Sequence, residues 1–151
     1  EQDVIYVGGG NTAALLAVWR AHGLDVILRE ALDEGAVLCG VSAGMNCWFE
    51  ASVTDSFGPA LAPLDDGLGL VEGSACPHYD AEAQRRPLYH RLVAAGFPPG
   101  YAADNGVALH FAGARDLVEA VTSREGARGY RVERREDGAA VEQALPTRYL
   151  W

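Results

Sequence analysis

Ser42 is the residue of this sequence best placed to act as a nucleophile. It lies at the centre of a Gly-Val-Ser-Ala-Gly segment, residues 40–44, directly after the apolar run 37–41. A serine on a sharp strand-to-helix turn needs small neighbours, because its backbone angles are strained. The two glycines provide that space, and the N–H of Ala43, at the start of a helix, could bind an oxyanion. The pattern indicates acyl transfer by Ser42, although the same residues also suit a strand end of small side chains.

A serine nucleophile needs a base, and the sequence offers four histidines: His22, His78, His90 and His110. His78 follows directly on a predicted strand, where open α/β sheets carry their sites. The other three fall at a predicted helix end, within a predicted helix and within a predicted strand. We therefore expect His78 to be the base.

A glycine loop, Gly8 to Gly10, permits two interpretations. Gly8, Gly10 and Ala13 fit a dinucleotide fingerprint, with Glu30 near the place of its ribose-binding acid. That interpretation requires residues 25–30 to form a strand, whereas their apolar positions repeat at helical spacing. We predict a helix over residues 25–34. An NAD- or FAD-binding module that uses the Gly8–Gly10 loop remains the alternative hypothesis.

The remaining pattern alternates between strand and helix. Predicted strands cover residues 4–7, 37–41, 67–75, 101–103, 107–111, 117–121, 130–133 and 140–144. Predicted helices run from Asn11 or Thr12 to about His22, over 25–34 and over 82–95. Asp104-Asn105-Gly106 has the composition of a tight hairpin turn. The sequence predicts one α/β domain over residues 1–151, with a mainly parallel sheet between helices and C-terminal β-hairpins.

Composition excludes several kinds of function. The net charge is −9, which argues against nucleic acid or an anionic membrane as a partner. All twelve basic residues are Arg, so Schiff-base chemistry, a Ser-Lys dyad and a Walker-type loop are excluded for this chain. The three cysteines have no metal-ligand spacing and favour a reducing, cytoplasmic location. A cysteine enzyme using Cys39 or Cys76 is a weaker third hypothesis, since neither precedes a predicted helix.

Three stretches together resemble peptidase E, the aspartyl dipeptidases, and the related cyanophycinases. They are VGGGNTAALL, GVSAGMNCWFE and CPHYD, in that order, and the resemblance runs from about Val4 to Leu109. It implies a serine hydrolase with a fold like the class I glutamine amidotransferases. It also implies that the opening strands and helices of the family domain are absent from this chain, so we expect the chain to be the C-terminal portion of a longer domain.

The resemblance also suggests roles for individual residues. Ser42 matches the nucleophile and His78 the base, while Gly9, Gly10 and Ala43 match the oxyanion-hole backbone. The family usually has an acidic residue just before a glycine in the strand after the one that carries the histidine. Here Asn105 aligns with that residue and Asp104 precedes it, so both are candidates to orient His78. Asp55 is a third candidate orienter, or else a ligand for the substrate's amino group.

Substrate recognition is expected to involve a cation, since the family cleaves dipeptides with N-terminal Asp. Arg85 and Arg86 follow His78 on the next predicted helix and could bind an aspartyl carboxylate, because a guanidinium can bind both oxygens. Asn11, beside the glycine loop, is a further candidate substrate contact. The expected substrate is a short peptide. We expect no metal or organic cofactor, and we expect the chain to form a homodimer if it associates at all.

Overall fold

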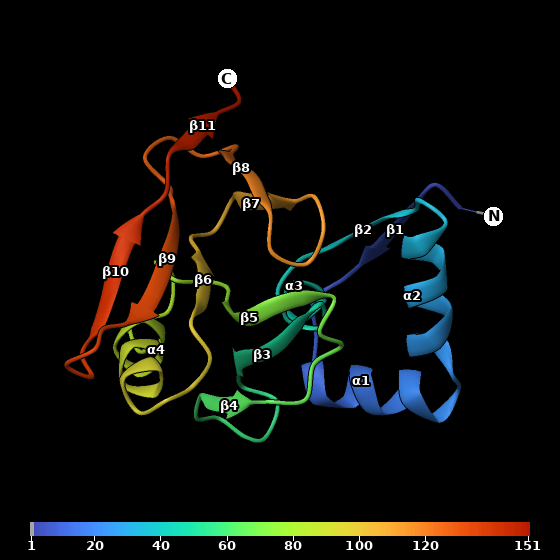
Figure 1. Ribbon diagram of the computed structural model, residues 1–151, viewed down its shortest axis with the longest axis horizontal. Coiled ribbons are helices and arrows are strands. Elements are labelled where there is room, and N and C mark those ends of the chain that lie inside the picture. The colour runs from blue at the N-terminus through green and yellow to red at the C-terminus, as the bar shows by residue number, and fades with distance from the viewer. Residues whose placement is uncertain (1) are drawn as a thin grey trace.

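The computed structural model describes residues 2–151 of the chain (Figure 1). The helices are α1 (Thr12–Ala21), α2 (Leu24–Asp33), α3 (Ala43–Asn46) and α4 (Arg85–Ala94). The strands that precede α4 are β1 (Val4–Val7), β2 (Val37–Gly40), β3 (Phe49–Thr54), β4 (Ala62–Leu64) and β5 (Val71–Cys76). The later strands are β6 (Gly100–Ala103), β7 (Val107–Phe111), β8 (Leu117–Thr122), β9 (Gly129–Arg134), β10 (Ala140–Ala144) and β11 (Thr147–Tyr149).

A six-stranded sheet in the order β10-β9-β6-β5-β3-β4 forms the centre of the molecule. Its middle strands β3, β5 and β6 are parallel, whereas β4, β9 and β10 pair in antiparallel fashion at the two sides. Helix α4 packs against β9 and β10. The predicted α/β class, with a parallel sheet core and helices around it, is confirmed.

Strands β1 and β2 form a separate parallel pair. The glycine loop follows β1, and the Gly-Val-Ser-Ala-Gly segment begins at the end of β2. Figure 1 shows this pair on the same side of the molecule as α1 and α2, away from α4 and the β9–β10 hairpin. The short helix α3 contacts β1, β2, β3 and β5, so it links the two sheets. The loops after β1, β2, β5 and β6, which all follow carboxyl ends of parallel strands, are therefore the natural place for a site.

Helix boundaries follow local signals. The side chain of Asn11 caps α1 by accepting a hydrogen bond from the Ala14 N–H at 2.8 Å. Gly23 lies in the left-handed region, with φ 68°, and allows α2 to start immediately after α1 ends. The predicted helix over residues 25–34 is confirmed. A dinucleotide fold would place a strand there, so the alternative hypothesis loses the strand that should carry its acidic residue.

Three predictions about strands were wrong. Strands β3, β4 and β11 were not predicted, although residues 49–54 of β3 alternate between apolar and polar side chains. The strand predicted over residues 67–75 begins at Val71, since residues 67–70 instead bond to carbonyls of residues 47–50. Asp104-Asn105-Gly106 does not close a hairpin: β6 lies in the six-stranded sheet, whereas β7 belongs to a three-stranded sheet in the order β11-β8-β7.

Candidate active site

Ser42 occupies a strained backbone conformation between β2 and α3. Its φ is 58° and its ψ is −114°, a combination that non-glycine residues rarely adopt. Among residues 2–151, Ser42 and His78 are the two non-glycine residues with positive φ. Such strain costs about 1–3 kcal/mol and persists where the surrounding structure enforces it, which is common at reactive sites.

Close backbone packing explains the two glycines that flank this turn. A Cβ at Gly44 would overlap the carbonyl group of Val7, and a Cβ at Gly40 would lie 2.6 Å from the Val7 oxygen. Both positions therefore need glycine so that β1 can lie against the turn. Val7 of β1 thus packs closely against both sides of the Ser42 turn, at Gly40 in β2 and at Gly44 in α3.

The glycine loop lies directly beside Ser42. A Cβ placed on Gly9 would lie 3.4 Å from the Ser42 Cβ and 3.9 Å from its Oγ. None of the hydrogen bonds found within residues 2–151 uses the backbone N–H of Gly9, Gly10 or Ala43. These donors are thus free to bind a negative oxygen that forms on a substrate held at Ser42.

Asn11 and Ser56 fix the end of this loop. The Asn11 amide group donates to the Ser56 carbonyl at 2.8 Å, while its oxygen caps α1. The Ser56 hydroxyl accepts from the Ala13 N–H at 3.2 Å and pairs with the Thr54 hydroxyl at 2.7 Å. The amide of Asn11, a predicted substrate contact, is therefore already used to hold the loop in place.

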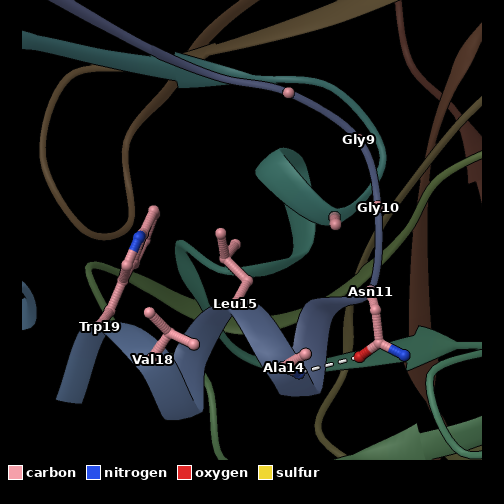
Figure 2. A pocket seen from close by; sticks show the side chains of 9 residues that line it. Gly9, Gly10, Asn11, Ala14, Leu15, Val18 and Trp19 are labelled. Atoms are coloured by element: carbon pink, nitrogen blue, oxygen red, sulfur yellow. Dashed lines mark hydrogen bonds between the residues drawn. The ribbon is translucent and has the colours of Figure 1, made fainter. Parts of the chain in front are cut away.

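A cavity of about 330 Å³ opens beside the glycine loop (Figure 2). Figure 2 shows Leu15, Val18 and Trp19 of α1 along it, with Gly9, Gly10 and Asn11 at its other end. Ala43 also lines it. The cavity thus brings mostly apolar side chains next to the candidate oxyanion donors.

His78 is the second strained residue, with φ 56°, in the loop after β5. Its Nδ1 lies 2.7 Å from the Asn105 Oδ1. An amide oxygen can only accept, so this contact is a hydrogen bond when Nδ1 carries a proton, and in that neutral tautomer Nε2 has the free lone pair that a base needs. No hydrogen bond joins Ser42 to His78 within the described residues.

The three candidate orienters of His78 have different surroundings. Asn105 contacts the ring, as described above. Asp104 is buried and accepts from the Arg128 N–H at 2.9 Å and from the Tyr130 hydroxyl at 3.4 Å; burial raises the pKa of its carboxyl group. Asp55 is exposed beside Ser56, and no hydrogen bond or ion pair of its side chain occurs in the described part of the chain. The structure therefore brings Asn105 to the histidine, and neither aspartate.

Asp80 also belongs to this site and was missed in the sequence. One of its oxygens accepts from the backbone N–H of Asn105 at 2.8 Å, and the other pairs with Arg124. Its position two residues after His78, in the same loop, was the available signal.

The two arginines predicted to bind substrate already have partners. Arg85 is 3 % exposed; it pairs with Glu82 at 2.8 Å and donates to the Val53 carbonyl at 3.1 Å. Arg86 pairs with Glu142 of β10 and stacks on the rings of Tyr79 and Tyr130. Neither arginine lines the cavity beside the glycine loop.

The cysteines show no sign of activation. Burial raises the pKa of the Cys76 thiol to about 12, so this thiol stays protonated at neutral pH. Cys39 lies within β2 and contacts the Ile5 carbonyl. These surroundings do not favour a cysteine nucleophile.

No cluster of three or more His, Cys, Asp or Glu side chains among residues 2–151 could hold a metal ion. No helix there is both long enough and apolar enough to cross a membrane.

The fold and the site place a strained serine and a histidine at strand ends of an α/β protein. The model of peptidase family S51 matches residues 1–117, so this chain belongs to peptidase family S51. This confirms the resemblance seen in the sequence.

Individual relatives agree with this assignment. The chain is 55 % identical over 151 residues to "Uncharacterized peptidase YgaJ" of Bacillus subtilis (strain 168), which covers 99 % of this chain and 64 % of that protein. It is 32 % identical over 127 residues to "Peptidase E" of Pasteurella multocida (strain Pm70), which covers 78 % of this chain and 54 % of that protein. "Peptidase E" of Haemophilus influenzae is 31 % identical over 119 residues, or 73 % of this chain and 55 % of the relative. The chain thus spans between 54 % and 64 % of the length of these curated relatives.

Proposed function

We propose that the protein is a serine peptidase that cleaves short peptides through an acyl-enzyme. The observation that carries this proposal is the strained Ser42 on the β2–α3 turn, beside a glycine loop whose N–H groups are unused. Strain at a serine has no structural benefit in itself, so its presence beside unused donors favours a chemical role.

In the first step, the Ser42 Oγ attacks the peptide carbonyl carbon while His78 Nε2 takes the hydroxyl proton. The carbonyl oxygen becomes an oxyanion, and the N–H groups of Gly9, Gly10 and Ala43 bind it. The C–N bond then breaks, and His78 returns its proton to the leaving amine. The products are the free amine and an ester on Ser42.

In the second step, water hydrolyses this ester. His78 takes a proton from water, the hydroxyl attacks the ester carbonyl, and the oxyanion forms again at the same donors. Breakage of the bond to Oγ then returns the proton to Ser42. Asn105 orients His78 in both steps, because its oxygen keeps the ring proton on Nδ1.

We further propose dipeptides with N-terminal Asp as substrates. The support is the name "Peptidase E" of several relatives together with the motif resemblance. Asp55 is exposed at the loop that holds Asn11, and its carboxylate, which pairs with no side chain among residues 2–151, suits a substrate's ammonium group. Binding of the aspartyl carboxylate by Arg85 or Arg86 would require either arginine to leave its present carboxylate partner. We also propose a cytoplasmic location, which the three free cysteines support.

Labelling with a serine-directed fluorophosphonate tests the nucleophile. We expect the protein to form a covalent adduct that peptide mapping places on Ser42, and we expect Ser42→Ala to abolish both labelling and dipeptide hydrolysis. Ser123→Ala is the matched control, because Ser123 is exposed in the loop after β8 and precedes no helix. Full labelling or turnover by the Ser42 variant would refute the proposal.

A further inference from the structure

We propose that Asp80 is a positioning residue for the reaction, since it holds Asn105 in the place from which Asn105 orients His78. This inference rests on the proposed role of His78 as the base. It concerns the last residue of the CPHYD stretch, to which the sequence analysis gave no role.

A closed ring of contacts connects the three residues. The Asn105 Oδ1 lies 2.7 Å from the His78 Nδ1, and the Asn105 backbone N–H donates to the Asp80 Oδ1 at 2.8 Å. Asp80 is only two residues after His78, so the chain itself closes the ring. A further bond, from the Tyr79 N–H to the Ala103 carbonyl at 3.1 Å, ties the loop after β5 to the end of β6. The loop after β5 and the loop after β6 are therefore joined by the bonds of Tyr79 and Asp80 as well as by the His78–Asn105 contact.

The position of Asn105 needs such a restraint. Asn105 is exposed and lies between the strands of two different sheets, so within the described part of the chain no strand partner binds its N–H. The turn around it is held by hydrogen bonds from the Val107 N–H to the Asp104 carbonyl and from the Ser123 N–H to the Gly106 carbonyl, which leave the N–H of Asn105 itself to Asp80. The bond to Asp80 is the one that the Asn105 N–H makes in this structure. Without it, an exposed amide side chain would gain conformational freedom at the cost of its contact with His78.

Asp80 is itself held in an ionised, oriented state. Its second oxygen pairs with Arg124, which follows β8, and its side chain is 29 % exposed. Partial burial opposes ionisation, but the hydrogen bonds from Arg124 and from the Asn105 N–H outweigh it and lower the pKa of Asp80. An ionised carboxylate accepts both bonds at neutral pH.

Asp80 makes no hydrogen bond to the His78 ring within the described residues, so it acts through Asn105. This distinguishes it from a catalytic acid of the usual triad. Its negative charge is also partly neutralised by Arg124. The expected effect of its loss is therefore on the geometry of the base, and so on kcat, while KM changes little.

The experiment measures dipeptide hydrolysis by Asp80→Ala and Asp80→Asn. We expect Asp80→Ala to lower kcat about 10-fold or more, the usual weight of residues that orient a catalytic group, with KM within about 2-fold. Asp80→Asn should recover most of the activity, because its amide oxygen can still accept from the Asn105 N–H. Glu119→Gln, which breaks the exposed pair with Arg148, is the control and should leave kcat unchanged.

A double-mutant cycle with Asn105→Ala separates positioning from simple stability. If Asp80 acts through Asn105, removal of Asp80 in the Asn105→Ala background should cause no further loss of kcat. Independent, multiplicative losses, or wild-type kcat in Asp80→Ala, would overturn the inference. If Asp80→Ala does not fold, hydrogen exchange of the Asn105 amide in the wild-type protein decides: a protected amide supports the inference, and exchange at the rate of an unbonded amide overturns it.

The inference about Asp80 and the proposed function can fail independently of each other. If Ser42→Ala keeps its labelling and turnover, the proposed function fails, whatever Asp80 does. If Ser42→Ala is inactive but Asp80→Ala behaves as wild type, only the inference about Asp80 fails.

Discussion

Glu142 is the residue whose removal should affect stability most clearly. It lies on β10 with its side chain 14 % exposed, and three groups of other elements converge on it. The Tyr79 hydroxyl donates to it at 2.6 Å, the Arg86 Nε donates at 3.1 Å, and the His90 Nε2 lies at 3.0 Å. This cluster connects α4 and the loop after β5 to the C-terminal hairpin.

These contacts set the size of the expected effect. Burial opposes ionisation of Glu142, but the hydrogen bonds from Arg86, Tyr79 and His90 outweigh it and lower its pKa from 4.5 to about 2. A shift of this size corresponds to about 3 kcal/mol of stability. Since Arg86 is half exposed and solvent screens its charge, we expect Glu142→Gln to lower the free energy of unfolding by about 2 kcal/mol at pH 7.

The sign of the pH dependence follows from the lowered pKa. The stabilisation by Glu142 is fully present above the pKa of the unfolded chain, near 4.5, and is lost as pH falls towards 2. Wild type should therefore lose this contribution between pH 4.5 and 2, whereas Glu142→Gln should not. Urea denaturation followed by tryptophan fluorescence at several pH values measures the difference.

Glu119→Gln serves as the stability control, because its pair with Arg148 is exposed on both sides and should contribute less than about 1 kcal/mol. If Glu142→Gln and wild type differ by no more than the control at pH 7, the cluster does not stabilise the fold as argued. A difference that persists unchanged at pH 2 would show that the carboxylate charge is not its source.

Three other predictions follow from the site. Asn105→Ala should lower kcat about 10-fold or more, whereas Asn105→Asp should keep activity, as measured by steady-state kinetics. Because the Asn105 side chain is exposed, thermal melts of Asn105→Ala should show little change in the unfolding midpoint. Arg85→Ala should destabilise the fold by about 2 kcal/mol and reduce turnover of aspartyl and alanyl dipeptides alike; a loss confined to aspartyl substrates would instead make it a specificity residue. Gly44→Ala should destabilise by about 3 kcal/mol or more in urea titrations, because its Cβ would overlap the Val7 carbonyl, and a variant of wild-type stability would contradict this packing.

The sequence by itself determined the local backbone of the site. The capping Asn11 and the helical spacing of residues 25–34 act on backbone a few residues away, so the sequence alone predicts their effect. Gly40 and Gly44 mark a turn of small residues in the sequence, but the contact with Val7 that requires them appears only in the tertiary structure. The elbow at Ser42, the strand before His78 and the helical alternative to a dinucleotide fold all followed from such signals.

Strand β3 shows where local reasoning failed. Its residues, Phe49–Thr54, alternate strictly between apolar and polar, the pattern of a half-buried strand, yet Ser52 and Thr54 are buried as well as Val53. Its place between β4 and β5 is determined by pairing with strands on either side. The alternation was a local signal for this strand that the sequence analysis overlooked, whereas the burial of its polar side chains depends on the neighbouring strands and helices.

Only the tertiary structure decided which polar side chains meet. Asn105, Asp104 and Asp55 are all polar residues at strand ends, and their types do not say which one faces His78. The partners of Arg86 and Asp80 come from residues more than forty positions away, Glu142 and Arg124. A charged side chain pairs with whichever partner the packing of distant strands brings within hydrogen-bond reach. The residues next to it in the sequence do not determine which partner that is.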